Sequence, residues 1–168
     1  MSKSKGNGVV PASMAVLYGV DALRAAILFG APPESDLNFD ENALASMQTF
    51  LSKTFKLCMK VTDQADCKDL SASELQSLVF ESREKEWTSS HISFMKECLS
   101  LLVDFEQKVG EHRLFHVAVA RLMELANKIQ KRSSMDDKLE RQLTLLVTNY
   151  LVHALYPIAP HMACELWA

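Results

Sequence analysis

The chain has 168 residues, with 18 Lys and Arg against 21 Asp and Glu, so its formal net charge is −3. Hydrophobic residues make up 48% and charged residues 23%, which excludes a disordered chain and predicts a domain with a real core. Five glycines and five prolines are few for a β-sandwich, and the acidic balance excludes a strongly basic wrapper of nucleic acid. No apolar run approaches the ~18 residues of a membrane span, so we expect no membrane partner.

The first eight residues, MSKSKGNG, are rich in lysine, serine and glycine. Such a segment cannot bury a core and favours an open backbone. Its ammonium groups, hydroxyls and backbone N–H groups can all bind phosphate oxygens, which indicates a loop for polyphosphate. A solvated chain start has the same composition, and the Walker pattern G-x-x-x-x-G-K-[ST] is absent from the sequence. Composition alone therefore leaves both interpretations open.

Two short helices are predicted directly after this loop. A proline in the first turn costs no hydrogen bond, so Pro11 can open a helix that ends at Gly19. Asp21 then caps a second helix, which reaches Phe29. We therefore expect residues 1–35 to form a loop with connecting short helices.

A third, long helix is predicted to open at a capping box over residues 38–41. Its apolar residues recur every three or four positions: Leu44, Met47, Leu51, Phe55 and Cys58. At about 100° per residue, three lysines fall together on the opposite face: Lys53, Lys56 and Lys60. Such a row can contact successive phosphates of an RNA strand, or it can be a solvated helix face, which is the commoner case. The spacing alone leaves both interpretations open.

Further helical stripes fill the rest of the chain, separated by polar turns. A second capping box lies at residues 71–74, and residues 87–90 either interrupt the following helical region or continue it. The last three stripes are Ile92, Met95, Leu99, Leu102, Phe105 and Val109; Phe115, Ala118, Val119, Leu122, Leu125, Ala126 and Ile129; and Leu139, Leu143, Leu146, Tyr150 and Ala154. No segment alternates with period two. We predict an all-α bundle of about five or six helices over residues 36–168, with the N-terminal flexible loop as an appendage.

Cysteine and histidine spacing argues against disulfides and metal sites. None of the cysteines forms a C-x-x-C pair, so we expect free thiols in a reducing compartment: Cys58, Cys67, Cys98 and Cys164. Only His112 and His116 share an i, i+4 spacing, and H-E-x-x-H is absent from the sequence, so we expect structural or surface histidines and no metal.

Three further side chains are assigned by local context. Glu140 is interpreted as a surface or capping charge, and Trp167 as a core anchor near a helix end. Trp87 lies in a charged stretch and stays open between packing and stacking on an RNA base.

Sequence elements at both ends of the chain match one known pattern. Residues 1–7, MSKSKGN, are similar to the signature Lys-Met-Ser-Lys-Ser without its leading lysine. Residues 18–34 contain YGVDALR and then ILFGAPPE, and residues 157–167 read PIAPHMACELW. Together these elements resemble the leucyl-tRNA synthetases of the bacterial and mitochondrial type, which are class I aminoacyl-tRNA synthetases. The last element resembles the end of their anticodon-binding helical domain.

The resemblance implies a fragment of an ATP-dependent leucine–tRNA ligase, which forms leucyl-adenylate and then Leu-tRNA. Its implied cofactors are ATP and Mg²⁺, and its implied partners are leucine and the leucine tRNA. By position in the signature, Lys3 is implied to be catalytic, stabilising the negative charge that develops as the carboxylate attacks the α-phosphate. The implied ATP-binding loop comprises Met1, Ser2, Lys3, Ser4 and Lys5.

The resemblance also extends to the helical part, where tRNA contact is implied for Arg24, Lys53, Lys56 and Lys60. Arg24 can equally anchor a helix end. Residues 60–114 resemble the family only in helical pattern. We expect a monomer, and we expect this chain alone to be inactive and free of cofactors because the nucleotide-binding fold is missing.

Drift from the family pattern, such as Phe39 in place of a frequent tryptophan, favours the mitochondrial matrix over a bacterial cytoplasm. The competing hypothesis is a non-catalytic helical protein-interaction module, which the acidic net charge supports.

Overall fold

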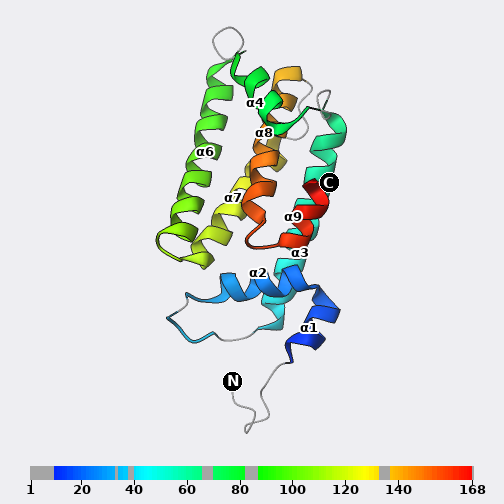
Figure 1. Ribbon diagram of the computed structural model, residues 1–168, viewed down its shortest axis with the longest axis vertical. Helices are drawn as coiled ribbons and strands as arrows, with labels where there is room; N and C mark the ends of the chain where they lie inside the picture. The colour runs from blue at the N-terminus through cyan, green and yellow to red at the C-terminus, as the bar shows by residue number, and fades with distance from the viewer. Residues whose placement is uncertain are drawn as a thin grey trace.

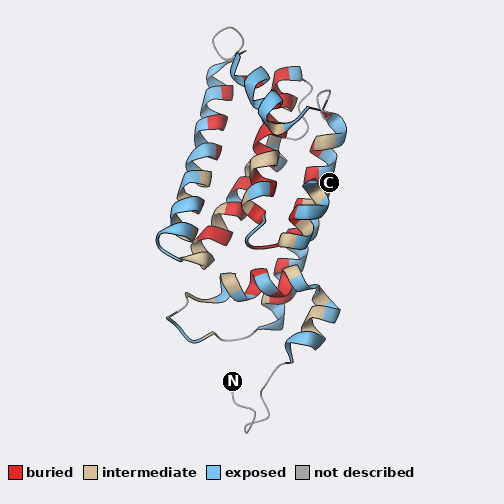
Figure 2. Cartoon of the chain, in the orientation of Figure 1, coloured by how far each residue is buried: buried red, intermediate tan, exposed pale blue. Residues whose placement is uncertain are grey.

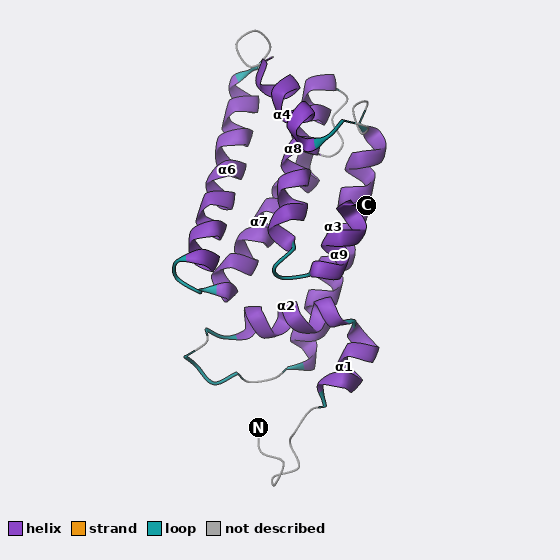
Figure 3. Cartoon of the chain, viewed as in Figure 1, coloured by secondary structure: helices purple, strands orange, loops and turns teal. Residues whose placement is uncertain are grey.

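The computed structural model describes residues 10–32, 34–37, 40–65, 70–81, 87–132 and 137–167, and all regular structure in these ranges is helical (Figure 3). The helices are α1 (Pro11–Tyr18), α2 (Val20–Gly30), α3 (Glu41–Gln64), α4 (Ala72–Glu81), α6 (Ser89–Gly110), α7 (Phe115–Arg132), α8 (Lys138–Leu155) and α9 (Pro160–Trp167). The all-α prediction is confirmed. Five or six helices is a slight undercount of the eight in the described ranges, six of which lie within residues 36–168.

The long helices α3, α6, α7 and α8 run along the long axis of the molecule, and α1 and α2 lie at one end of them (Figure 1). Helix α8 packs against α3, α4, α6, α7 and α9, and its side chains Leu143, Leu146 and Leu151 are fully buried. Burial follows the inward faces of the helices (Figure 2). Removing this apolar surface from water, at ~25 cal/mol per Å², is the main force that assembles such a bundle.

A sharp bend separates α1 from α2 at Gly19. This residue has φ 88° and ψ 151°, a conformation that favours glycine, and its N–H donates to the carbonyl of Ala15 at 2.9 Å. The prediction that Gly19 ends the first helix is therefore confirmed. Over the described ranges, no single helix is long and apolar enough to cross a membrane; α1 and α2 together reach that length and composition, but with a bend of 115°.

Polar side chains fix where the longer helices begin. The Asp40 carboxylate accepts from the Asn42 N–H at 2.9 Å, so α3 is capped by Asp40, and Asn38 of the predicted box lies outside the described residues. The second predicted box is confirmed, because the Ser71 N–H donates to Glu74 Oε2 at 2.9 Å and the Glu74 N–H donates to Ser71 Oγ at 3.4 Å.

The region around residues 87–90 interrupts the helices. Helix α4 ends at Glu81 and α6 begins at Ser89, with Thr88 as its capping residue. Trp87 is half-buried against the core, with its ring 6.0 Å from that of Phe80. Packing is therefore the observed role of Trp87.

The buried face of α6 differs from the predicted stripe. Ile92 and Leu99, expected in the core, are 47% and 37% exposed, whereas Phe94 and Cys98 are buried, and Met95 is common to both faces. The stripes of α7 and α8 are mostly buried as predicted. The α6 prediction was wrong at these two residues only, because Met95 and Phe105 are buried and Leu102 and Val109 pack partly buried against the core.

Candidate functional site

The residues singled out from the sequence fall into two groups. Met1, Ser2, Lys3, Ser4 and Lys5 lie outside the described residues. Arg24 lies on α2, and the lysine row, defined as Lys53, Lys56 and Lys60, lies on α3. All three lysines of the row are exposed, on the side of α3 away from its buried residues. The predicted solvent exposure of the row is therefore confirmed.

Arg24 has a structural partner. Its Nη2 donates to the carbonyl oxygen of Pro157 at 3.2 Å, in the connection between α8 and α9. This is the helix-anchoring role that the sequence left open beside tRNA contact. The bond ties α2 to the end of the bundle.

Asp21 has a role other than the one expected. The N-terminal residue before α2 is Gly19, so Asp21 does not cap its own helix. Its carboxylate instead accepts from the Met162 N–H at 2.8 Å and lies 2.8 Å from His161 Nδ1. Asp21 thus caps α9 from a distant helix, with its charge at the positive end of that helix. Short-range capping rules could not reveal a partner 141 residues away.

A hollow of about 580 Å³ opens where the α1–α2 junction, α3 and the start of α9 meet. We call it the junction groove. Its lining residues are Tyr18, Gly19, Val20, Asp21, Ala22, Gln48, Leu51, Ser52, Phe55, Lys56, His161 and Met162. Lys56 therefore joins the lysine row to the groove, and the Asp21–His161 pair belongs to the opposite wall.

A smaller hollow of about 340 Å³ lies beside α9. It is lined by Val152, His153, Tyr156, Ala163, Cys164 and Trp167. The Trp167 ring lies 4.2 Å from that of His153, and Trp167 is 53% exposed. The interpretation of Trp167 as a core anchor is therefore wrong, because α9 presents this side chain to the surface.

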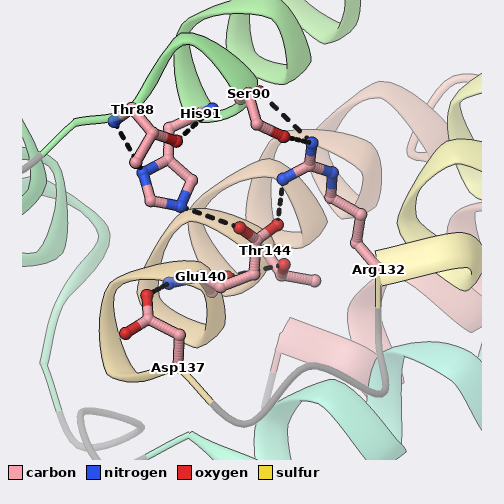
Figure 4. Close-up of polar contacts among 7 residues, drawn as sticks. All are labelled: Thr88, Ser90, His91, Arg132, Asp137, Glu140 and Thr144. Atoms are coloured by element: carbon pink, nitrogen blue, oxygen red, sulfur yellow. Dashed lines mark hydrogen bonds and ion pairs between the residues drawn. The ribbon is translucent and has the colours of Figure 1, made fainter.

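The most buried charges form a network between α6, α7 and α8 (Figure 4). The Glu140 carboxylate, whose side chain is 4% exposed, binds Arg132 through Oε1 and His91 Nε2 at 3.0 Å through Oε2. Arg132 also donates to Ser90 Oγ at 2.6 Å. The Thr88 N–H donates to His91 Nδ1 at 3.2 Å, so Nε2 carries the proton directed at Glu140. Glu140 was interpreted as a surface or capping charge, and the structure corrects this, because its carboxylate is buried between Arg132 and His91.

The described thiols and acids offer little chemistry of their own. Cys58, Cys98 and Cys164 are free, as predicted, and Cys67 lies outside the described residues. Burial raises the pKa of the Cys58 and Cys98 thiols to about 12, so neither is a nucleophile at neutral pH. Over the described ranges, no three His, Cys, Asp or Glu side chains group as ligands of a metal ion.

Comparison with solved structures shows where this fold recurs. No family model matches the chain. A leucyl-tRNA synthetase of Agrobacterium radiobacter, solved as a ternary complex with tRNA and LeuAMS, shares the fold with a TM-score of 0.76 and 21% identity over 99% of this chain and 20% of its own. Methionyl-tRNA synthetase of Mycobacterium tuberculosis, in its free state, has a TM-score of 0.58 and 16% identity over 94% of this chain and 34% of its own. The chain thus shares its fold with one segment of each of these two synthetases.

Sequence comparison then identifies the particular relatives. The leucine–tRNA ligases of Shewanella baltica and Shewanella oneidensis are each 30% identical to this chain over 167 residues, which is 99% of the chain. The chain spans about 18% of the length of these curated relatives. The resemblance to leucyl-tRNA synthetases is thus confirmed: the homologues of the chain are leucine–tRNA ligases, of which it matches one small segment. These relatives are bacterial and give no support to the mitochondrial prediction.

Proposed function

We propose that this chain is the part of a leucine–tRNA ligase that combines the ATP-closing signature loop with a helical tRNA-docking domain. The observation that carries the proposal is the match of 99% of the chain to leucine–tRNA ligases at 30% identity. Its structural neighbour of 0.76 TM-score was crystallised with tRNA bound, which supports tRNA as the partner. A bacterial cytoplasm is the compartment that the bacterial relatives favour.

In the whole ligase, we assign residues 1–35 to the signature loop with its connecting helices and residues 36–168 to the docking bundle. Lys3 of the loop would stabilise the charge on the α-phosphate as leucyl-adenylate forms, with Met1, Ser2, Ser4 and Lys5 completing the ATP-binding loop. ATP and Mg²⁺ would be held mainly by the remainder of the ligase. We therefore expect the isolated chain to catalyse no leucine-dependent exchange of pyrophosphate into ATP. A monomeric state remains a separate expectation, which size-exclusion chromatography would test.

The lysine row is the proposed tRNA contact. Lys53, Lys56 and Lys60 are exposed along one side of α3, and lysines aligned in this way neutralise backbone phosphates without reading bases. Arg24 is a weaker candidate, because its guanidinium already donates to the carbonyl of Pro157.

The test is a fluorescence titration of the chain with a leucine tRNA transcript at low and moderate salt. We expect binding that weakens steeply with salt, because each neutralised phosphate releases counterions with a slope of about −0.7 to −0.9 in log K against log salt. Replacing the three lysines of the row by alanine should weaken binding and reduce this slope by about two to three.

The matched control removes the same charge elsewhere. Lys96, Lys131 and Lys138 are exposed lysines on α6, α7 and α8. Their triple alanine variant should bind tRNA with nearly the affinity and salt slope of the wild type. Equal losses in the two variants would mean that net charge, rather than a site on α3, governs binding.

A protein-interaction module is the second candidate, and helix α1 favours it. None of the α1 residues is buried, and Val16 and Leu17 are 85% and 65% exposed. Apolar surface of this kind marks protein contacts. Absence of tRNA binding at low salt would leave this candidate in place of RNA docking.

A further inference from the structure

The junction groove has a polar edge made by one stripe of α3. Gln48, Ser52 and Lys56 all line the groove and follow each other at steps of four residues, which is about 6 Å of helix rise per step. An amide, a hydroxyl and an ammonium group thus stand in a line, and all three side chains are exposed. Each of them can donate hydrogen bonds to phosphate or sugar oxygens.

The floor of the groove has a different character. Its lining includes two half-buried aromatic side chains, Tyr18 and Phe55, together with the apolar side chains of Leu51 and Met162. Aromatic faces of this kind are surfaces on which a planar base can stack. The groove therefore combines aromatic and aliphatic lining residues with a row of donors.

The ammonium group of Lys56 favours an anion in the groove. The imidazole of His161, with its side chain 74% exposed, is a further polar group among the lining residues. The one carboxylate among the lining residues, Asp21, is turned toward His161 Nδ1 and the Met162 N–H at 2.8 Å each. Its side chain is only 13% exposed, so its negative charge is largely compensated inside the wall.

We propose that the junction groove is a nucleotide subsite, in which one unpaired nucleotide of the bound tRNA places its base against Tyr18 and Phe55 and its phosphate at Lys56. The proposal rests on the proposed tRNA-docking function and deepens it by naming the place and the form of the contact. It distinguishes Lys56, which lines the groove, from Lys53, which belongs to the same lysine row but lies outside the lining.

The side of the groove formed by α2 and α9 is held in place before any ligand arrives. Asp21 binds the start of α9 at Met162, and Arg24, one turn further along α2, binds Pro157 at 3.2 Å. These two contacts join α2 to the start of α9 and to the connection before it, so the lining residues Asp21, His161 and Met162 are fixed relative to one another. A preorganised site loses less conformational entropy when a ligand binds.

The experiment fills the groove and compares it with an equal change outside. Ser52→Trp places an indole among the lining residues, and Met59→Trp places one on the same helix at a side chain that is 44% exposed and outside the lining. With a leucine tRNA transcript as the probe, we expect Ser52→Trp to weaken binding about tenfold or more, the loss typical of a removed base–aromatic contact. Met59→Trp should stay within about twofold of the wild type, the error expected for a change that removes no contact.

A second pair of variants separates the subsite from general charge. Lys56→Ala and Lys53→Ala each remove one positive charge from the lysine row, so both should lower the salt slope by about one. At the same moderate salt concentration, Lys56→Ala should bind tRNA more weakly than Lys53→Ala, because it also removes the phosphate contact in the groove. Circular dichroism of each variant checks that the helices remain folded.

The outcomes keep the two proposals apart. If the wild-type chain fails to bind tRNA at low salt, the docking function and the subsite fall together. If the wild type binds tRNA, and Ser52→Trp and Met59→Trp bind it with the same affinity as each other, the docking function stands and the subsite is overturned. Equal losses of tRNA affinity in Lys56→Ala and Lys53→Ala would also overturn the subsite, since each lysine of the row would then contribute only its charge.

Discussion

The network around Glu140 gives the sharpest test of what holds the bundle together. Replacing Arg132 by methionine keeps an unbranched apolar stem but removes the guanidinium that binds Glu140 Oε1, Ser90 Oγ and the Ser90 carbonyl. It leaves a carboxylate whose side chain is 4% exposed with His91 as its remaining partner in the network. We expect this substitution to destabilise the fold strongly.

The magnitude follows from burial. Removing one partner of a buried ion pair costs about 3–5 kcal/mol, because the other charge stays in the interior without compensation. The Arg132 side chain is 17% exposed and keeps some contact with water, which argues for the lower end, about 3 kcal/mol. The guanidinium also lies 4.6 Å from the centre of the Phe94 ring, a contact worth about 0.5–1 kcal/mol at a partly exposed site. For a chain of this size, 3 kcal/mol lowers Tm by about 6–12 °C.

Urea unfolding followed by circular dichroism, with a thermal scan beside it, measures the loss. The matched control is Arg121→Met, also on α7, whose guanidinium binds Asp104 at 2.5 Å and Glu124 at 2.8 Å with 32% of the side chain exposed. Surface pairs of this kind contribute about 0–1 kcal/mol. Equal destabilisation by the two substitutions would refute the reasoning. Adding Glu140→Leu to Arg132→Met should recover part of the loss, because the uncompensated charge is then gone.

Three further predictions follow from local chemistry. Burial raises the pKa of the Cys58 and Cys98 thiols to about 12. Iodoacetamide at about pH 8 should therefore modify the exposed Cys164 of the folded protein, and Cys58 and Cys98 only after unfolding. Mass spectrometry of the treated protein measures this. Gly19→Ala should lower the free energy of unfolding in urea by about 1–3 kcal/mol, because alanine is strained at φ 88°. A steric clash is not the cause, since no atom lies within 4 Å of the added methyl group. The control Gly110→Ala has equal space and no positive φ, so it should cost nothing. The hydrogen bond from Arg121 lowers the pKa of Asp104, so the ionised carboxylate stabilises the folded state. This stabilisation is complete above the ordinary carboxyl pKa and is lost as the pH falls through the lowered value. The free energy of unfolding of Arg121→Met should therefore fall less than that of the wild type between neutral pH and about pH 3.

Much of the fold follows from rules that act over one or two helical turns. Gly19 ends α1, the Ser71–Glu74 box opens α4, and the lysine row lies exposed on α3 as its spacing predicts. Each of these features depends on residues that are close in sequence, so the local sequence is enough to predict it. The helix class was predictable for the same reason.

The burial of Phe94 and Cys98 in place of Ile92 and Leu99 was not predictable from periodicity alone. Apolar residues occupy two overlapping stripes in the first half of this helix, one through Ile92 and Leu99 and one through Phe94 and Cys98, and both contain Met95. In the first turn, His91 lies on the buried side and contacts Glu140 of α8, which is 49 positions away in sequence. The spacing within α6 carries no signal of this contact.

The partners of Glu140 were equally hidden. Its position in the first turn of α8 is typical of an exposed charge near a helix start, and Arg132 stands at the edge of a polar turn. One local signal was present, since His91 follows Thr88 by three residues, the spacing of a capping box with histidine in place of glutamate. That pattern locates the helix start, but it does not show that the other ring nitrogen meets a buried carboxylate.

The same kind of long-range contact joins the site to the fold. Asp21 and Arg24 lie one turn apart on α2, and both bind the segment that carries α8 into α9. Helix α2 also packs on α3, the helix that carries the lysine row. Helix α1 follows across the bend at Gly19 and contacts α3 as well. The junction groove that we propose as a subsite is thus positioned by contacts between α1, α2, α3 and α9, and the partners of Asp21 and Arg24 lie too far away in sequence for any local rule to reveal them.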